Sequence, residues 1–123
     1  MRSVIVKKSY GSVKVFWLNR EVLLERLKNI AHKIIADDRN VESVVLFGSL
    51  AENRATPLSD IDILIIVSYS HKRFIDRPLD FIDYFKDLEL NVDLFVYTKE
   101  ELDKSPLFKN SVLSKGKYLA RRF

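Results

Sequence analysis

The sequence predicts an α+β fold in which a small mixed β-sheet carries packed helices and follows an N-terminal β-hairpin. Three short runs rich in apolar and β-branched residues, at 44–47, 61–67 and 91–97, are typical of buried strands. After Asn19 and before the polar run at 37–40, apolar residues repeat at helical spacing. Because 47% of the 123 residues are hydrophobic, the chain can bury one core, and we expect a single domain over residues 1–123.

The N-terminal segment predicts the hairpin. Alternating runs near 4–6 and 13–16, separated by Tyr10-Gly11, are typical of two antiparallel strands within residues 1–18. Such a hairpin could cover a sheet edge, form a dimer interface or dock a partner. The sequence therefore leaves open whether the protein is a homo-oligomer.

A helix is predicted directly after the hairpin. Asn19 is a suitable N-cap, and the helix should end near Asp37. His32 falls on the outer face, where it has no partner motif that would indicate catalysis. The apolar stripe on the inner face consists of Leu23, Leu27, Ile30 and Ile34.

The strand that ends at Gly48 predicts a phosphate-binding turn. The apolar run 44–47 stops at Gly48, where the absence of a Cβ lets another backbone or a phosphate approach closely. We expect a short helix to begin at Ser49, so that its free N–H groups and the Ser49 hydroxyl face an anion. Gly48 and Ser49 are therefore candidate phosphate-binding residues.

Ten residues after Ser49, two aspartates lie at the start of a central strand. Side chains alternate along a strand, so Asp60 and Asp62 project from one face, about 6.6 Å apart at a rise of about 3.3 Å per residue. Carboxylate oxygens favour Mg²⁺ or Mn²⁺, which would compensate two like charges at the mouth of an apolar strand. The alternative is a pair of structural aspartates that cap the strand.

A third carboxylate lies near the start of the strand predicted at 91–97. If this strand lies beside the one that follows Asp60, Asp93 faces Asp60 and Asp62. The three carboxylates then form a triad in which two members bind metal and one is available as general base. The alternative is an ordinary aspartate at a strand edge, because spacing in the sequence does not establish that the two strands are neighbours. Asp60, Asp62 and Asp93 are thus the candidate catalytic and metal-binding residues.

The remaining elements complete a catalytic core over residues 19–98 and a helical, basic extension over 99–123. Short helices are expected at 100–103 and 107–113, the second closed by Gly116. A longer helix, from Pro78 to Leu88, turns inward the apolar side chains of Phe81, Tyr84, Phe85 and Leu88. A solvated tail is the first interpretation of the terminal basic residues, which could also touch phosphates: Lys115, Lys117, Arg121 and Arg122.

Composition and charge restrict the class of protein. The chain has no cysteine, which excludes disulfides, thiolate zinc sites and a cysteine nucleophile. It has no apolar stretch of transmembrane or signal-peptide length, so we expect a cytoplasmic protein without membrane association. Residues 1–50, 51–100 and 101–123 carry 9, 6 and 6 basic and 5, 10 and 2 acidic side chains, giving net charges of +4, −4 and +4. The acidic middle holds the candidate site, and the basic flanks could steer a polyanion such as ATP, an RNA or an acidic protein.

These residues resemble the DNA polymerase beta-like nucleotidyltransferases, and among them the minimal nucleotidyltransferase proteins that contain little beyond the catalytic core. The likeness spans roughly residues 20–98 and rests on Gly48-Ser49, ten residues, Asp60-Ile61-Asp62 and then Asp93. It implies that Gly48 and Ser49 contact the nucleotide phosphates. It also implies that the three acids hold divalent metal, with Asp93 activating the acceptor hydroxyl.

The same resemblance implies in-line transfer of AMP from ATP with release of pyrophosphate. Proteins of this kind are commonly encoded beside HEPN-domain proteins, and in characterised pairs the nucleotidyltransferase is an antitoxin that adenylylates a tyrosine of the HEPN ribonuclease toxin. A short chain also has little left with which to build a second substrate pocket. A HEPN-domain toxin is therefore the expected partner, and ATP the expected nucleotide.

Two positions depart from the family pattern. Many relatives place Arg-Gly after the alanine of the short helix, where this chain has Glu52-Asn53. Asn53 can adopt the left-handed conformation that ends a helix, so the turn can survive. Arg54 could replace the missing arginine at a phosphate, and a solvated surface arginine is the equal alternative.

Three other functions are alternatives to protein adenylylation. A non-catalytic module could bind nucleotide and neutralise a partner by masking its surface; the missing Arg-Gly favours this, and the mutual repulsion of three acids opposes it. Small-molecule adenylyltransferases usually carry an additional helical domain that this chain lacks. RNA tailing would require an RNA-binding appendage, and none is evident.

Overall fold

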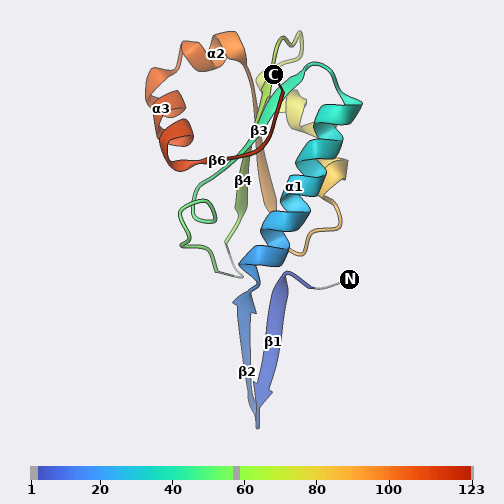
Figure 1. The fold of residues 1–123 in the computed structure, drawn as a ribbon, viewed down its shortest axis with the longest axis vertical. Coiled ribbons are helices and arrows are strands. Elements are labelled where there is room, and N and C mark those ends of the chain that lie inside the picture. The colour runs from blue at the N-terminus through green and yellow to red at the C-terminus, as the bar shows by residue number, and fades with distance from the viewer. Residues whose placement is uncertain (1–2, 57–58, 123) are drawn as a thin grey trace.

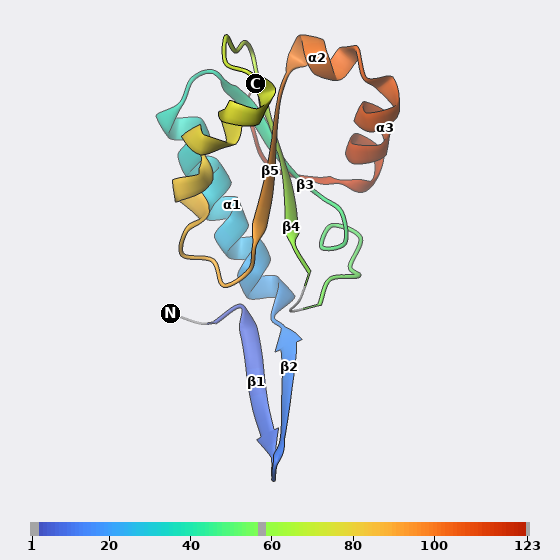
Figure 2. The same cartoon turned by 180° about the vertical axis from the view of Figure 1, so that it is seen from behind.

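A computed structural model describes residues 3–56 and 59–122 and confirms the α+β fold (Figures 1 and 2). No helix in these two ranges is long and apolar enough to cross a membrane. In chain order the elements are β1 (Ile5–Tyr10), β2 (Val13–Leu18), α1 (Arg20–Asp37), β3 (Val41–Phe47), β4 (Ile61–Val67), the 3₁₀ helices η1 (Phe74–Asp80) and η2 (Ile82–Phe85), β5 (Val92–Thr98), α2 (Lys99–Asp103), α3 (Pro106–Lys115) and β6 (Lys117–Arg121).

A four-stranded sheet with the order β5-β4-β3-β6 forms the centre of the molecule. Strand β3 runs antiparallel to both β4 and β6, whereas β4 and β5 are parallel. The sheet is therefore mixed, as predicted. The parallel pair places the starts of β4 and β5 at the same end of the sheet.

Helices cover both faces of this sheet (Figure 1). Because side chains alternate along a strand, Ile63 and Ile65 of β4 pack in the core that includes α1, whereas Leu64 and Ile66 pack with Leu102 of α2. This second, smaller core also joins side chains of β3, β5 and α3. The face of the sheet that carries the smaller core is the one on which the candidate site lies.

Helix α1 follows the predicted pattern. The Asn19 side chain accepts a hydrogen bond from the Val22 N–H at 3.3 Å, which confirms the N-cap. His32 is exposed, as expected. The predicted stripe faces the core, with Leu23, Leu27 and Ile34 fully buried and Ile30 partly buried.

Strands β1 and β2 form a separate two-stranded sheet that projects away from the central sheet (Figures 1 and 2). Gly11, at a φ of 62°, occupies the turn between Tyr10 and Val13. At the base of the hairpin the Ser3 hydroxyl donates to Glu89 at 2.6 Å. The predicted hairpin is confirmed, and it does not cover an edge of the central sheet.

The segment from Pro78 to Leu88 does not form the single helix that the sequence predicts. It forms two 3₁₀ helices that begin earlier, at Phe74, and are separated at Phe81. The Phe81 N–H donates to the Pro78 carbonyl at 3.0 Å, and each later turn is closed by a bond of the same i to i+3 type. The predicted inner face is correct: Phe81 and Phe85 are buried, and Tyr84 and Leu88 pack against the core.

The C-terminal segment contributes more than the predicted helices. Both helices are present and Gly116 caps α3, its N–H donating to Val112 at 2.7 Å, but β6 then pairs with β3 in the central sheet. Arg122 donates from Nε to the Val41 carbonyl at 3.0 Å and from Nη2 to the carbonyls of Ile35 and Asp38. The solvated-tail interpretation is therefore wrong for residues 117–122, because strand pairing and exposed helix-end carbonyls hold them in place.

Candidate active site

The three candidate carboxylates come together at one end of the sheet. Strands β4 and β5 are neighbours, and Asp62 lies at the register position directly opposite Asp93. Asp60 stands immediately before β4, two residues from Asp62, and therefore shares its face. Asp62 is partly buried, whereas Asp60 and Asp93 are exposed. The structure therefore confirms that the strand that carries Asp93 lies beside the strand that carries Asp62.

The ionised carboxylates at this end of the sheet repel one another in the protein without a ligand. Burial raises the pKa of the Asp62 carboxyl, and the nearby charges of Asp93 and Asp60 raise it further. Each of these causes disfavours the ionised form. A bound cation would act in the opposite direction, because it compensates the clustered negative charge.

The donor set suits a hard divalent cation such as Mg²⁺ or Mn²⁺, since it offers only carboxylate oxygens and the chain has no thiolate. Within residues 3–56 and 59–122, no three His, Asp or Glu side chains already enclose a common metal position. Asp62 and Asp93 hold paired positions, so side-chain rotation, rather than a change of fold, would bring their oxygens to one ion.

Gly48 is the residue that makes room for Asp62. It directly follows Phe47, which pairs with Asp62 across β3 and β4, and it has a φ of 76°. A Cβ at this position would lie 2.2 Å from Oδ2 of Asp62. The close approach expected at Gly48 is therefore made by the Asp62 carboxylate, and a side chain at this position would displace that carboxylate.

A turn follows Gly48, where the sequence analysis predicted a helix beginning at Ser49. The Glu52 N–H donates to the Gly48 carbonyl at 3.1 Å, and the Arg54 N–H donates to the Ser49 carbonyl at 2.7 Å. Asn53 stops the chain after one turn by adopting a φ of 59°, the left-handed conformation predicted for it.

This turn still offers donors to an anion. Among the described residues, no carbonyl accepts a hydrogen bond from the backbone N–H groups of Ser49, Leu50 or Ala51. Consecutive free N–H groups suit phosphate oxygens without a helix. The predicted helix is wrong, and the predicted supply of free donors beside Ser49 is present.

Two arginines border the turn in different ways. Arg54 forms an ion pair with Glu52 at 3.1 Å, and its side chain is 62% exposed. Arg20, at the start of α1, donates from Nη2 to the Leu50 carbonyl at 3.4 Å. Nε of Arg20 is the buried side-chain nitrogen that lacks a hydrogen-bond partner in the described part of the chain. Sequence reasoning overlooked Arg20, because its position as the first helical residue gave no signal of contact with a turn 30 residues away.

Comparison with known proteins identifies the family. The profile of the nucleotidyltransferase domain matches residues 24–119, which include all the candidate carboxylates and the Gly48-Ser49 turn. The chain belongs to this nucleotidyltransferase family. MJ1379 of Methanocaldococcus jannaschii, named as a candidate protein adenylyltransferase, is 36% identical over 93 residues, covering 72% of this chain and 90% of that protein. MJ0126 of the same organism, named in the same way, is 34% identical and covers 76% and 86%.

Solved structures agree with this assignment. A candidate nucleotidyltransferase from Sulfolobus solfataricus superposes with a TM-score of 0.62 at 25% identity, covering 84% of each chain. A toxin–antitoxin solved with AMP-PNP superposes with a TM-score of 0.57 at 22% identity, covering 85% of this chain and 75% of that one. At this identity the second likeness shows the nucleotidyltransferase fold. Arg20 lies just before the region that the family profile matches.

Proposed function

We propose that this nucleotidyltransferase transfers AMP from ATP to a hydroxyl group of a partner protein, with Mg²⁺ or Mn²⁺ held by Asp60, Asp62 and Asp93. The observation that carries the proposal is the register of β4 and β5, which sets Asp62 opposite Asp93 beside Gly48. Neighbouring carboxylates at one end of the sheet destabilise the ionised protein unless a cation compensates them. A cytoplasmic setting, where ATP and Mg²⁺ are at hand, is part of the proposal.

Each residue has a distinct part in the proposed transfer. The cation, when bound, neutralises charge on the phosphates. The free N–H groups and hydroxyl at Ser49 donate hydrogen bonds to phosphate oxygens of ATP. Asp93 accepts the proton of the acceptor hydroxyl, whose oxygen attacks the α-phosphorus. The bond from that phosphorus to the bridging oxygen breaks, and pyrophosphate leaves as AMP becomes joined to the acceptor.

A protein acceptor is supported by two of the comparisons. The relatives from M. jannaschii are named as candidate protein adenylyltransferases, and one structural neighbour is a toxin–antitoxin. In addition, the described residues form one four-stranded sheet with packed helices and a projecting two-stranded hairpin, which resembles a catalytic core that acts on a separate acceptor. We propose that the acceptor is a tyrosine of a HEPN-domain toxin, which the nucleotidyltransferase inactivates as its antitoxin.

The test is transfer of label from ATP to the candidate partner. The protein is incubated with Mg²⁺ and the product of the adjacent gene, the candidate HEPN-domain toxin, once with α-labelled and once with γ-labelled ATP. We expect label to arrive from the α position alone and to be lost in the Asp60→Asn/Asp62→Asn variant. Peptide mapping then identifies the modified side chain. Label arriving from the γ position would instead indicate phosphoryl transfer and contradict the proposal.

A non-catalytic binding module is the second candidate. The pairing of Arg54 with Glu52 favours it, because that arginine is already engaged on the surface of the turn. On this account the partner binds tightly and is inhibited, but no label is transferred. Transfer to a small alcohol or aminoglycoside in place of the protein would identify the third candidate, a small-molecule adenylyltransferase.

A further inference from the structure

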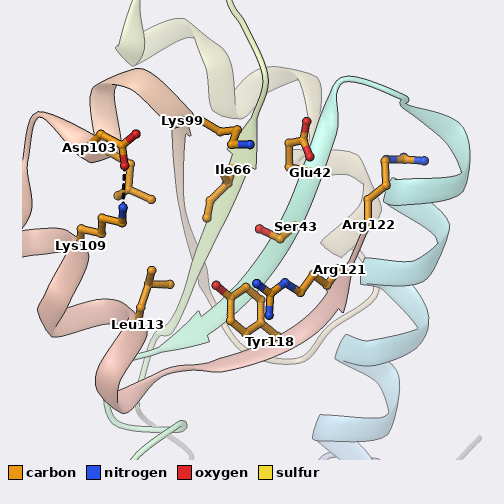
Figure 3. Close-up of a pocket in the computed structure, with 11 residues that line it drawn as sticks. Glu42, Ser43, Ile66, Lys99, Asp103, Lys109, Leu113, Tyr118, Arg121 and Arg122 are labelled. Carbon is orange, nitrogen blue, oxygen red and sulfur yellow. Dashed lines mark hydrogen bonds and ion pairs between the residues drawn. The ribbon is translucent and has the colours of Figure 1, made fainter.

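A second polar pocket lies on the same face of the sheet as the carboxylates, at the other end (Figure 3). Its volume is about 360 Å³, and its walls come from β3, β4 and β6 on one side and from α2 and α3 on the other. Ile66, which lines it, is four residues from Asp62 on β4, roughly 13 Å at a rise of about 3.3 Å per residue. Leu64 and its apolar neighbours lie between the two sites. The pocket is therefore separate from the candidate active site.

The floor of this pocket is a row of residues on three adjacent strands. Ser43 pairs with Ile66 of β4 on one side and with Arg121 of β6 on the other. Ser43 is only 5% exposed, and among the described residues its hydroxyl forms no hydrogen bond. Figure 3 shows its oxygen pointing into the pocket. Because no described residue occupies this hydroxyl, it can donate a hydrogen bond to a ligand in the pocket.

Charge in the pocket is predominantly positive. Four cations and two carboxylates line it: Lys99, Lys109, Arg121 and Arg122, with Glu42 and Asp103. Lys109 pairs with Asp103 at 2.6 Å, and Arg122 donates to backbone carbonyls at the end of α1.

Two of the cations stay available to a ligand. Lys99 forms no ion pair within 4 Å with the described residues. The hydrogen bond and charge of Lys109 are the main causes that lower the pKa of nearby Asp103, and the charge of Lys99 adds a smaller effect. The Arg121 guanidinium stacks over the Tyr118 ring at 4.4 Å and has no acceptor among these residues. Stacking fixes the plane of a guanidinium without using its hydrogen-bond donors. Lys99, Arg121 and Ser43 thus offer donors from three sides of the pocket.

We propose that this pocket binds a small phosphorylated molecule, whose phosphate accepts hydrogen bonds from Lys99, Arg121 and Ser43. A phosphate monoester carries a charge of about −1.5 to −2 at pH 7. The four cations and two carboxylates that line the pocket leave a net charge that matches it. Ile66, together with Leu102, supplies an apolar surface for the organic part of the ligand. The volume falls at the lower end of the range for ligand pockets, about 300–1,000 Å³, and suits a monophosphate.

The test is an amide NMR titration of the full chain with inorganic phosphate and, separately, with AMP, in buffer containing EDTA. We expect saturable shifts at Ser43, Ile66, Lys99 and Arg121. Replacing one cation, in Lys99→Gln or Arg121→Gln, should raise the dissociation constant about tenfold, since charged hydrogen bonds contribute most to such sites. Ser43→Ala should raise it about threefold.

Lys104→Gln is the matched control, because Lys104 lies just beyond the end of α2, pairs with the exposed Glu100 and does not line the pocket. Amide spectra of the free variants verify their folding. Tighter binding of AMP than of phosphate assigns the site to a phosphate ester, whereas equal binding assigns it to free phosphate; both support a phosphate site. Shifts confined to residues 48–51, equal weakening by Lys104→Gln, or shifts that do not saturate with either probe would overturn the proposal.

Discussion

The two ends of the central sheet differ in how their charged side chains are arranged: like charges lie close together at one end, and opposite charges are paired at the other. At the carboxylate end, formed by Asp60, Asp62 and Asp93, like charges lie together and raise the pKa of Asp62. At the opposite end, beyond the last residues of β5, Arg77 donates to both oxygens of Glu101, at 2.6 and 3.0 Å. That hydrogen bond is the main cause that lowers the pKa of Glu101 to about 2.

This difference separates residues that stabilise the fold from residues that require a ligand. The Arg77–Glu101 pair joins η1 to α2, and Arg77 also donates to the Val96 carbonyl at 3.1 Å. The carboxylate end gains no such compensation from the described residues. Groups held in an unfavourable charge state are typical of functional sites. Substitutions at the carboxylate end should therefore affect transfer more than stability, and substitutions at the opposite end should do the reverse.

The largest effect is expected for Asp62→Asn. Removing a proposed metal ligand should lower transfer of α-label from ATP roughly a thousandfold. The free energy of unfolding should stay the same or rise by less than about 1 kcal/mol, because one of three like charges is lost. Initial transfer rates and urea denaturation in EDTA measure the two quantities.

Asp80→Asn is the control for Asp62→Asn, since Asp80 pairs with the exposed Lys72 far from the candidate site and should leave transfer unchanged. The pH dependence gives a second check. Because the folded-state pKa of Asp62 is raised, its ionisation removes stability as pH rises above its ordinary value of 3.8, and Asp62→Asn abolishes that loss. A large fall in stability of Asp62→Asn at pH 7 would show that the aspartate is structural.

A smaller but still large effect is expected for Gly48→Ala. The added Cβ would displace the Asp62 carboxylate, whose Oδ2 lies 2.2 Å from its position. A misplaced catalytic group typically lowers rates about a hundredfold, so transfer should fall by about that factor.

Gly11→Ala provides the matched control for Gly48→Ala. Gly11 also has a positive φ, 62°, but a Cβ there meets nothing within 4 Å. Both variants should lose about 1 kcal/mol of stability from backbone strain, and only Gly48→Ala should lose transfer. Equal transfer by the two variants would contradict the role assigned to Gly48.

Sequence patterns predicted the carboxylate end well because its information is local. Alternation along one strand placed Asp60 and Asp62 on one face, and the left-handed tendency of asparagine predicted the conformation of Asn53. The neighbouring position of Asp93 stayed conditional, because strand pairing is a tertiary property. Gly48 was assigned to a ligand or backbone, since no local pattern could show that the Asp62 carboxylate fills the space beside it.

The opposite end was predicted less well because its structure depends on long-range contacts. Strand β6, Lys117–Arg121, is short and basic, and its pairing with β3 overrides the solvent-exposed character of its sequence. Arg77 gave no signal either, although it is only 6% exposed. Its partner Glu101 follows 24 residues later, and only the fold brings the two together.

At that opposite end, Glu101→Gln tests the other half of the comparison. It leaves the guanidinium of Arg77, whose side chain is 8% exposed, without its counter-charge. Because Glu101 itself is 41% exposed, solvent screens part of the effect, and a loss of about 1–2 kcal/mol is expected. Transfer of AMP should be unchanged.

The pH dependence of that loss follows from the lowered pKa of Glu101. Its stabilising effect is complete above the ordinary value of 4.5 and disappears as pH falls towards about 2, so wild type and Glu101→Gln should converge there. Glu100→Gln, which removes an exposed pair with Lys104, is the matched control and should cost less than about 0.5 kcal/mol. Urea denaturation at several pH values measures all three proteins, and a constant difference down to pH 2 would contradict this account.

The smallest effect distinguishes the two arginines beside the Gly48 turn. Arg54 is largely exposed and paired with Glu52, so Arg54→Lys should change the KM for ATP less than threefold, given the small contribution of exposed pairs. Arg20 contacts the Leu50 carbonyl and keeps a buried nitrogen without a partner, so it positions the turn from the protein side. Lysine cannot reproduce the forked donors of arginine, and Arg20→Lys should raise KM about fivefold with little change in kcat. A larger effect at Arg54 would instead assign to it the phosphate contact made by the missing family arginine, and would leave Arg20 as a structural support.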